Sequence, residues 1–139
     1  MADIVSTDRR SENMRRIRSK GTKPEIAVRR LAHSLGHRFR LHRSTLPGKP
    51  DLVFPTTKKI VEVRGCFWHQ HPGCIDSHIP KSRIDYWGPK LEKNVRRDRR
   101  NVRALRKLGW DVLVIWECEV RPARYLTLKA KLRRFLGHK

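Results

Sequence analysis

Two carboxylates lie where the sequence predicts the ends of paired strands. Asp51 begins one short apolar run, and Glu62 lies in the next. If Phe54 pairs with Lys59 across the turn between these runs, antiparallel pairing places Asp51 opposite Glu62. Arg64, two residues after Glu62, then lies on the same face of the sheet. Carboxylate oxygens are the ligands that Mg²⁺ prefers, so this cluster is a candidate for a catalytic Mg²⁺ site.

The order of these residues resembles the PD-(D/E)xK motif of metal-dependent nucleases. Pro50 and Asp51 come first, ten residues follow, and Glu62-Val63-Arg64 completes the motif with arginine where lysine is usual. In such a site Asp51 would bind Mg²⁺, and Glu62 would supply a second carboxylate. The alternative is a surface ion pair between Arg64 and the acids, which contributes little to stability or function.

Three cysteines and a histidine form a second cluster with metal-ligand chemistry. Cys66, His71 and Cys74 lie close together in the sequence, and Cys118 follows another apolar run. Three thiolates and one imidazole are the ligand set of a closed structural zinc site. Spacing alone does not choose among the histidines, and the rivals of His71 are His69 and His78. The other interpretation is three free cysteines, since cysteine also behaves as a small core residue.

The charge of the chain indicates a polyanionic partner. The sequence has 139 residues, with 34 Lys and Arg against 13 Asp and Glu, which gives a formal net charge of +21. Self-repulsion at this level is best offset by nucleic acid. The odd number of cysteines argues against a disulfide framework. The sequence has no apolar run long enough to span a membrane and no signal-peptide form, so we expect a cytoplasmic protein.

The predicted elements place both clusters at strand ends. A capping pattern from Thr22 to Glu25 begins an amphipathic helix that Gly36 ends, and Glu25 is interpreted first as the capping glutamate. Strands are predicted at 39–42, 51–54, 59–64 and 111–116. Two further helices are predicted at about 90–108 and about 122–135. A chain of this length suits one domain.

The helix predicted at 90–108 is strongly basic. Its expected apolar stripe consists of Leu91, Val95, Val102, Leu105 and Leu108. The arginines available for DNA phosphates are Arg96, Arg97, Arg99, Arg100, Arg103 and Arg106. A solvated charged face is the alternative, but repulsion among so many arginines favours phosphate binding. Residues 1–20 are interpreted as a DNA-binding arm or a solvated segment, and residues 21–139 as the single domain.

The chain resembles the Vsr family of very-short-patch mismatch repair endonucleases over nearly its whole length. The most specific motifs are Gly65-Cys66-Phe67-Trp68-His69 and Trp116-Glu117-Cys118. The other matching segments are Arg10 to Arg15, Leu46 to Asp51, Lys93 to Val95, Arg97 to Arg100 and Leu108 to Trp110. The resemblance implies an α/β fold of the restriction-endonuclease type, with a central mixed sheet flanked by helices and a structural zinc site.

The same resemblance implies an activity and a set of functional residues. It implies a Mg²⁺-dependent enzyme that nicks DNA 5′ of the thymine in T:G mismatches left by deamination of 5-methylcytosine. Asp51 would hold the Mg²⁺, His69 would take part in proton transfer, and Glu25 would support the site. The implied zinc ligands are Cys66, His71, Cys74 and Cys118. The partner would be double-stranded DNA, and we expect a monomer; whether general mismatch-repair proteins assist is left open.

An aromatic wedge is also implied, formed by Phe67, Trp68 and Trp87. Independently of the resemblance, aromatic side chains on a zinc-braced loop of a basic protein could unstack a base step. The competing interpretation is that these residues belong to the core.

Two features depart from the best-known members of that family. Those members have Thr-His in place of Val63-Arg64 and an apolar residue in place of Glu62, and an arginine cannot act as a general base. One extra residue also separates His71 from Cys74. Two other functions stay open: a nuclease of the same fold with another target, and a zinc-bearing DNA-binding module without catalysis. The pairing of Asp51 with Glu62 favours an enzyme over the module.

Overall fold

The computed structural model describes residues 22–137, so the predicted arm at 1–20 lies outside the described residues. Its helices are α2 (Lys23–Ser34), α3 (Ile84–Lys107) and α4 (Tyr125–Leu136), and its strands are β1 (Arg40–Leu41), β2 (Leu52–Phe54), β3 (Lys59–Arg64) and β4 (Asp111–Trp116). Short 3-10 helices are η2 (Ile75–Ser77), η3 (Lys81–Arg83), η4 (Glu117–Val120) and η5 (Pro122–Arg124). Within residues 22–137, none of the helices combines the length and the apolar character needed to cross a bilayer.

The four strands form one mixed sheet in the order β1-β2-β3-β4. The first three strands pair antiparallel, and β3 pairs with β4 in parallel. Phe54 pairs with Lys59, which confirms the register predicted for the hairpin. Strands β3 and β4 have the predicted bounds, whereas β1 and β2 are shorter and Asp51 lies just before β2. Parallel neighbours need a long crossover, and helix α3 provides it.

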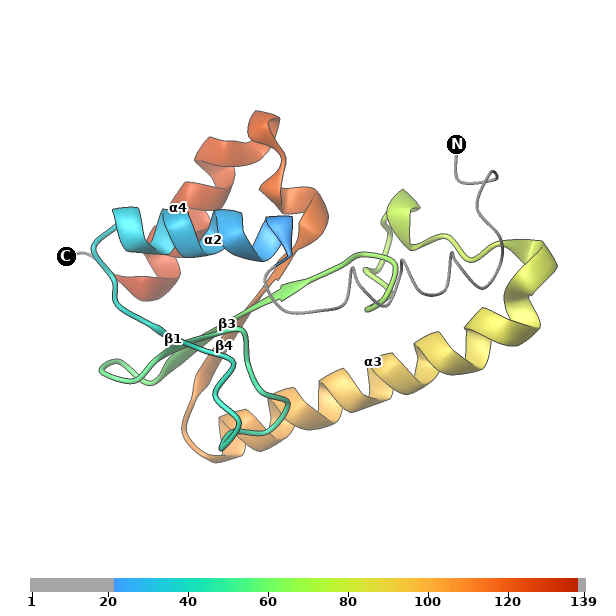
Figure 1. Ribbon diagram of the computed structural model, residues 1–139, viewed down its shortest axis with the longest axis horizontal. Coiled ribbons are helices and arrows are strands. Elements are labelled where there is room, and N and C mark those ends of the chain that lie inside the picture. The colour runs from blue at the N-terminus through green and yellow to red at the C-terminus, as the bar shows by residue number, and fades with distance from the viewer. Residues whose placement is uncertain (1–21, 138–139) are drawn as a thin grey trace.

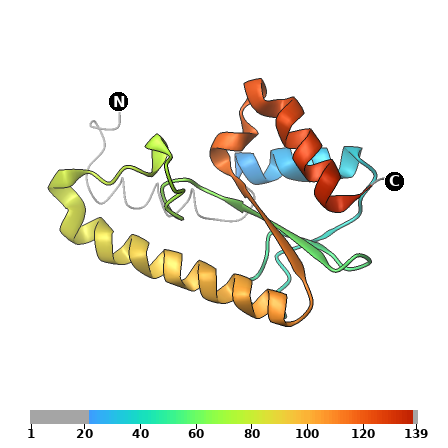
Figure 2. The same cartoon turned by 180° about the vertical axis from the view of Figure 1, so that it is seen from behind.

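Helices cover both faces of the sheet, as expected (Figure 1, and from behind Figure 2). On one face, apolar side chains of α2 and α4 pack on Leu52, Val61 and Ile115. On the other face, Val53 and Ile60 pack with Leu105 of α3 and with Trp110. Adjacent residues of one strand therefore serve opposite layers, because side chains alternate across a strand.

Helix α2 begins as predicted and also delivers a functional group. The hydroxyl of Thr22 accepts a hydrogen bond of 3.4 Å from the backbone N–H of Glu25, and Pro24 lies in the first turn. Gly36, at φ 88°, follows the end of the helix. The side chain of Glu25 itself is almost fully buried, with 3% of the residue exposed, and its carboxylate pairs with Arg29. Its carboxylate is turned into the molecule toward the ends of β1 and β2.

Helix α3 ends close to the predicted end but begins earlier than predicted, and one residue of its expected buried stripe is exposed. It begins at Ile84, ahead of Pro89, and the loss of one helical hydrogen bond at this proline is offset by the burial of Trp87 and Leu91 against Trp68. Leu108 is 55% exposed, so its expected place in the buried stripe is wrong. After the helix the chain folds back, and Trp110 packs beside Leu105 where Leu108 was expected.

Candidate active site and metal centre

A cleft of about 680 Å³ opens where β3 and β4 end. All of the acids and bases predicted to act in catalysis line it, namely Glu25, Asp51, Glu62 and His69. They come from α2, from the residue before β2, from β3 and from the loop after β3. The fold thus brings together groups that lie in four separate segments of the sequence.

Asp51 is held by the main chain of β3. The backbone N–H of Val63 donates a hydrogen bond of 2.8 Å to Oδ2 of Asp51. The pKa of Asp51 is raised to about 7, mainly by burial and further by the charges of Glu25 and Glu62, against the lowering effect of the Val63 hydrogen bond. A carboxyl group in this state takes up a proton near neutral pH unless a cation lies beside it. The environment of Asp51 therefore fits a cation site.

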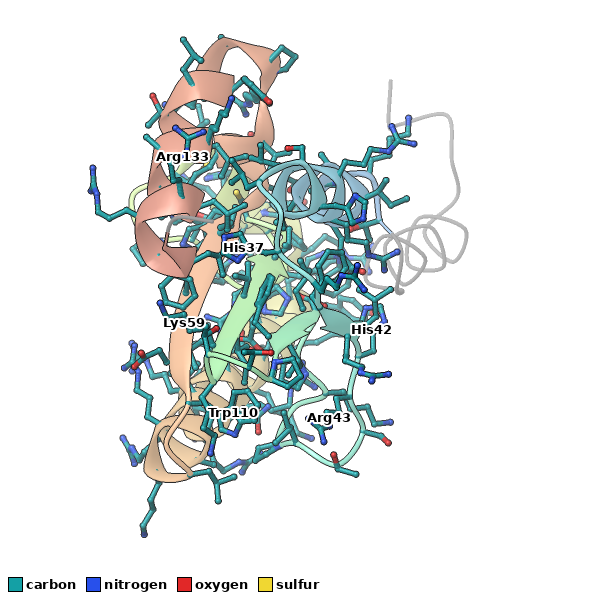
Figure 3. All side chains as sticks on the ribbon, turned by 90° about the vertical axis from the view of Figure 1, so that its left-hand side faces the viewer. His37, His42, Arg43, Lys59, Trp110 and Arg133 are labelled. Atoms are coloured by element: carbon teal, nitrogen blue, oxygen red, sulfur yellow. The ribbon has the colours of Figure 1, made fainter. Side chains whose placement is uncertain are left out.

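His42, which the sequence analysis missed, lies between Asp51 and Glu25. Its Nε2 atom is 3.0 Å from Oε2 of Glu25 and 3.7 Å from Oδ1 of Asp51. Figure 3 shows His42 directly after the short strand β1. Arg29, one helical turn after Glu25, forms an ion pair with the same Glu25 oxygen. His42 follows a strand of only two residues and lies opposite Asp51. A strand pair this short has no sequence pattern that fixes its register.

His69 is paired with an acid from α3. Its Nδ1 atom lies 2.5 Å from Oδ2 of Asp98, and both side chains line the cleft. A carboxylate on Nδ1 favours the tautomer that carries its proton there, so Nε2 is left to exchange a proton with a reacting group. Asp98 was also missed as a functional residue, although it is the one acid among the arginines of 96–100.

Glu62 and Arg64 form an ion pair beside the cleft. Arg64 Nη2 donates to Oε2 of Glu62 over 2.8 Å, and each side chain is mostly buried. The Arg64 guanidinium also lies 5.9 Å from the centre of the Trp116 ring. Same-face placement of Glu62 and Arg64, expected from the period of the strand, is therefore observed. Each of them lines the cleft with Asp51.

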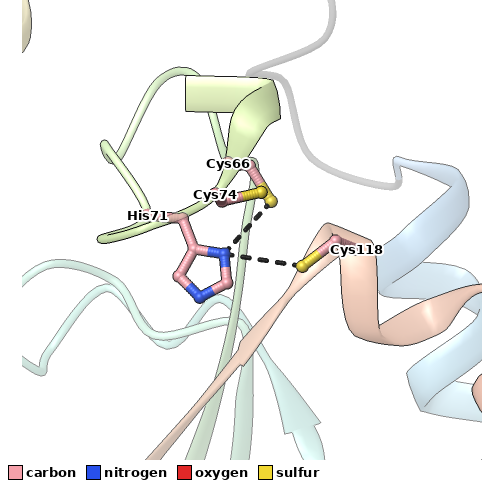
Figure 4. Close-up of side chains that lie close together, drawn as sticks. All are labelled: Cys66, His71, Cys74 and Cys118. Carbon is pink, nitrogen blue, oxygen red and sulfur yellow. Dashed lines mark hydrogen bonds between the residues drawn. The ribbon is translucent and has the colours of Figure 1, made fainter. Parts of the chain in front are cut away.

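The cysteine and histidine cluster also assembles as predicted. Ligand atoms of Cys66, His71, Cys74 and Cys118 all lie within 4.8 Å of one another. Figure 4 shows the His71 ring between the thiols from the loop after β3 and the thiol that follows β4, and His71 Nδ1 is 3.7 Å from Sγ of Cys66 and 3.5 Å from Sγ of Cys118. Zn–N and Zn–S bonds of about 2.0 and 2.3 Å at a tetrahedral angle span about 3.5 Å. The spacing fits zinc.

The structure also shows which of the three candidate histidines lies beside the thiols. His71 stacks on Trp116, with ring centres 4.3 Å apart, and this contact holds its imidazole against the thiols. His69 faces Asp98 instead, and among the described residues His78 belongs to no such group. Burial raises the pKa of the Cys66 thiol to about 12, so a cation is needed for this group to ionise.

The aromatic residues of the expected wedge form one cluster. Phe67, Trp68 and Trp87 meet edge to face, with ring centres 5.3 to 5.6 Å apart. Lys90 lies 5.6 Å from the centre of the Trp68 ring. Only 4% of Trp68 and 5% of Trp87 is exposed, so in this structure the two indoles pack as core residues. Asn94, buried on α3, donates a hydrogen bond of 3.2 Å to the Trp68 carbonyl and fixes the loop.

Helix α3 presents its arginines along an exposed face. Arg97 lines the cleft, and the exposed arginines of the helix are Arg96, Arg99, Arg100, Arg103 and Arg106. Arg96 is paired with Glu92 at 2.6 Å, and an exposed ion pair of this kind contributes little to the stability of the fold. The helix therefore extends a line of positive charge from the cleft, as a phosphate-binding surface requires.

Comparison with known proteins finds a matching family model and several similar relatives. Residues 2–74 match the family model described as DNA mismatch endonuclease Vsr. The chain is 52% identical over 136 residues to the type II nicking enzyme V.XorIIP of Xanthomonas oryzae pv. oryzae, which covers 98% of each protein. It is 45% identical over 121 residues to the type II nicking enzyme V.NmeAIP of Neisseria meningitidis, covering 87% of this chain and 86% of that protein. It is 40% identical over 134 residues to the DNA mismatch endonuclease Vsr of Escherichia coli, covering 96% of this chain and 85% of that protein.

Proposed function

The chain belongs to the Vsr family and is a DNA endonuclease, and from this premise we propose that it nicks one strand of DNA 5′ of the thymine in T:G mismatches. The family resemblance inferred from the motifs is thereby confirmed. The single observation that supports a catalytic role best is the cleft, which unites Asp51 with the His69–Asp98 pair. A DNA-binding module without catalysis would have no need of that combination.

Asp51 would hold a Mg²⁺ ion in this mechanism, with Glu25 and Glu62 as further carboxylates beside it. The carboxylate oxygens of these residues are the donors that a hard cation prefers. The raised pKa of Asp51 shows that its negative charge lacks compensation, which such a cation would supply. Such an ion supplies neutralisation of charge at the scissile phosphate. The role of Glu62 depends on Arg64, which already balances its charge at 2.8 Å. Asp51 would therefore be the main carboxylate ligand of the ion, and Glu62 a secondary one.

His69 would move a proton during hydrolysis. Phosphodiester cleavage adds water to phosphorus, breaks one P–O bond and requires a proton on the leaving oxygen. The imidazole can exchange that proton at Nε2, because Asp98 accepts the proton on Nδ1 and fixes the orientation of the ring. Arg64 and Arg97 line the same cleft and can contact the phosphate oxygens.

Recognition of DNA would combine charge and stacking. The net charge of +21 and the arginines of α3 supply binding to the backbone without sequence information. Trp68 lines the cleft and belongs to the aromatic cluster, which supports a role for this cluster in entering the duplex next to the cleavage site. Insertion of Phe67, Trp68 and Trp87 requires the packed cluster to open, at a cost that a mispaired site makes smaller.

The zinc-type centre would be structural. Four protein ligands leave no open position for water, and Cys118 would link the loop after β3 to the end of β4. We propose a restriction-endonuclease-like fold braced in this way, acting as a monomer. The mixed sheet with helices on both faces supports this assignment.

A nicking assay tests the proposal. Duplexes that carry each of the possible mismatches are compared with a matched duplex, with and without Mg²⁺. We expect strand cleavage 5′ of thymine on the T:G duplex and only with the ion. Equal cleavage of another mismatch would assign a nuclease with a different target. Binding without cleavage on every duplex would identify a DNA-binding module.

A further inference from the structure

We infer that His42 is a ligand of the catalytic cation, so that Glu25, His42 and Asp51 form a mixed carboxylate and imidazole site that prefers Mn²⁺ to Mg²⁺. The inference rests on the proposed function, because it concerns the same cleft. It differs from a site of carboxylates alone, which the PD-(D/E)xK pattern predicts. The three residues come from α2, the end of β1 and the start of β2.

The distances among the three side chains fit one ion. One ligand atom from each residue lies within 4.8 Å of the others. His42 Nε2 is 3.0 Å from the Glu25 oxygen and 3.7 Å from the Asp51 oxygen. Adjacent ligands at about 2.1 Å from an octahedral ion are about 3.0 Å apart. The 3.0 Å pair already has this spacing, and the 3.7 Å pair would have to close by about 0.7 Å for both acids and His42 to bind one octahedral ion.

The nitrogen of His42 that faces the carboxylates lacks a hydrogen bond. Nε2 is buried and has no hydrogen-bond partner among the described residues, although Oε2 of Glu25 lies only 3.0 Å away. The distance suits a hydrogen bond, but the direction does not. Buried polar atoms in folded proteins almost always have a partner. A ring nitrogen and a carboxylate oxygen that lie 3.0 Å apart without a hydrogen bond between them are the arrangement expected when both bind one cation.

The backbone fixes His42 beside Asp51. The N–H of His42 donates a hydrogen bond of 3.2 Å to the carbonyl oxygen of Asp51, which extends the pairing of Leu41 with Leu52 by one residue. His42 adopts a left-handed conformation with φ 44°, which is uncommon outside glycine and marks a constrained position. Arg29 supports Glu25 from outside, as groups behind a metal ligand commonly do. The site is therefore preorganised.

An imidazole ligand changes the choice of metal. Mg²⁺ strongly prefers oxygen, whereas nitrogen ligands favour first-row transition ions. Mn²⁺ is the appropriate probe because it competes poorly with zinc for thiolates, so the cluster of Cys66, Cys74 and Cys118 keeps its own metal. The competing arrangement is an ion pair in which a protonated His42 simply neutralises the two acids.

Pulsed electron paramagnetic resonance separates these arrangements. The zinc-loaded full chain is titrated with Mn²⁺, and nitrogen coupling to the bound Mn²⁺ is recorded. We expect coupling in the parent protein and its loss in His42→Gln, together with a fall in Mn²⁺ affinity of at least about tenfold, the scale on which site-supporting groups act. His33→Ala is the matched control, because His33 lies exposed on α2, and it should behave like the parent.

A second measurement needs no substitution. Replacing histidine nitrogen by ¹⁵N in the parent protein should change the coupling pattern, which keeps the test valid if His42→Gln folds poorly. Mn²⁺ that binds the parent without nitrogen coupling, and is lost in Asp51→Asn, would overturn the inference and leave the Mg²⁺-dependent nuclease intact. A parent protein that nicks DNA with no divalent cation would instead overturn both.

Discussion

Nδ1 of His69 lies 2.5 Å from Oδ2 of Asp98, although one residue belongs to the loop after β3 and the other to the middle of α3. The zinc-type centre involves the same loop, so the position of His69 depends on two supports. Asp98 sets the ring and its tautomer, and the loop sets its distance from Asp51. The position of His69 relative to Asp51 is thus fixed by contacts between elements and not by β2, which begins one residue after Asp51.

Asp98→Asn should lower the nicking rate by about 10²-fold or more, the range typical of lost proton transfer. An amide can donate to Nδ1 and so favours the tautomer with its proton on Nε2, which is the wrong one for exchange there. DNA affinity and thermal stability should change little. Single-turnover nicking measures the effect, and Asp111→Asn, an exposed acid at the start of β4, is the control. Equal rates for Asp98→Asn and the parent would remove Asp98 from the mechanism.

Asp51→Asn should abolish nicking and spare binding to DNA. Removal of a negative charge that faces the phosphate should leave the affinity equal to that of the parent or slightly higher. Fluorescence anisotropy on a T:G duplex gives the affinity, and gel analysis gives the nicking rate. Nicking by Asp51→Asn in Mg²⁺ at the rate of the parent would contradict the metal-nuclease mechanism.

The protein without Mg²⁺ should lose stability as the pH rises from about 4 to about 7. The pKa of Asp51 is raised from 3.8 to about 7, so between these values the folded state binds more protons than the unfolded state. The stabilisation that Asp51 contributes by binding a proton in the folded state is fully present below pH 3.8 and is lost as the pH rises through about 7. It amounts to at most about 4 kcal/mol.

Urea unfolding at about pH 5 and about pH 8 measures this effect, with the zinc centre kept loaded. In Asp51→Asn the difference between the two pH values should be smaller by the contribution of Asp51. If the parent and the variant show the same pH dependence, the carboxyl of Asp51 titrates at its ordinary pKa.

Cys118→Ser should lower the zinc content and the melting temperature together. A structural zinc ion contributes its binding energy directly to folding, and this thiol joins β4 to the loop after β3. His71→Ala should behave in the same way, whereas His69→Ala should keep its zinc and lose most activity. Metal analysis and calorimetry on the same samples provide the measurement. A zinc-free parent that melts like Cys118→Ser would refute the assignment.

Trp68→Ala and Arg100→Ala should affect DNA binding in different ways. Loss of the indole should reduce the preference for a T:G over a T:A duplex, because the stacking group is removed. Loss of the exposed Arg100 should weaken both complexes alike and reduce the salt slope by about 1. Binding isotherms over a range of salt concentrations separate the two effects. An equal loss on both duplexes for Trp68→Ala would count against intercalation.

Local patterns predicted the parts of the site that local geometry determines. The hairpin between β2 and β3 gave the register of Asp51 and Glu62, and the spacing of Cys66, His71 and Cys74 indicated a metal centre. These features depend on period and turn length, which a sequence carries directly.

Contacts between distant elements could not be predicted in the same way. His42 reaches Asp51 through a strand of two residues, and Asp98 reaches His69 only because α3 packs against the loop after β3. Leu108 was expected to be buried by its helical spacing, but Trp110 takes that place after the chain turns back. Tertiary packing, which a single sequence does not display, decided each of these cases.

The three residues of β2 limit where the length of this chain can vary. All of them are buried, and the turn at 55–58 that follows is exposed. An insertion in that turn would lengthen a surface loop and leave Asp51 against the N–H of Val63. A single inserted residue between Asp51 and Phe54 would turn the carboxylate to the opposite face of the sheet. Natural or engineered length changes are therefore tolerable on one side of Phe54 and disabling on the other.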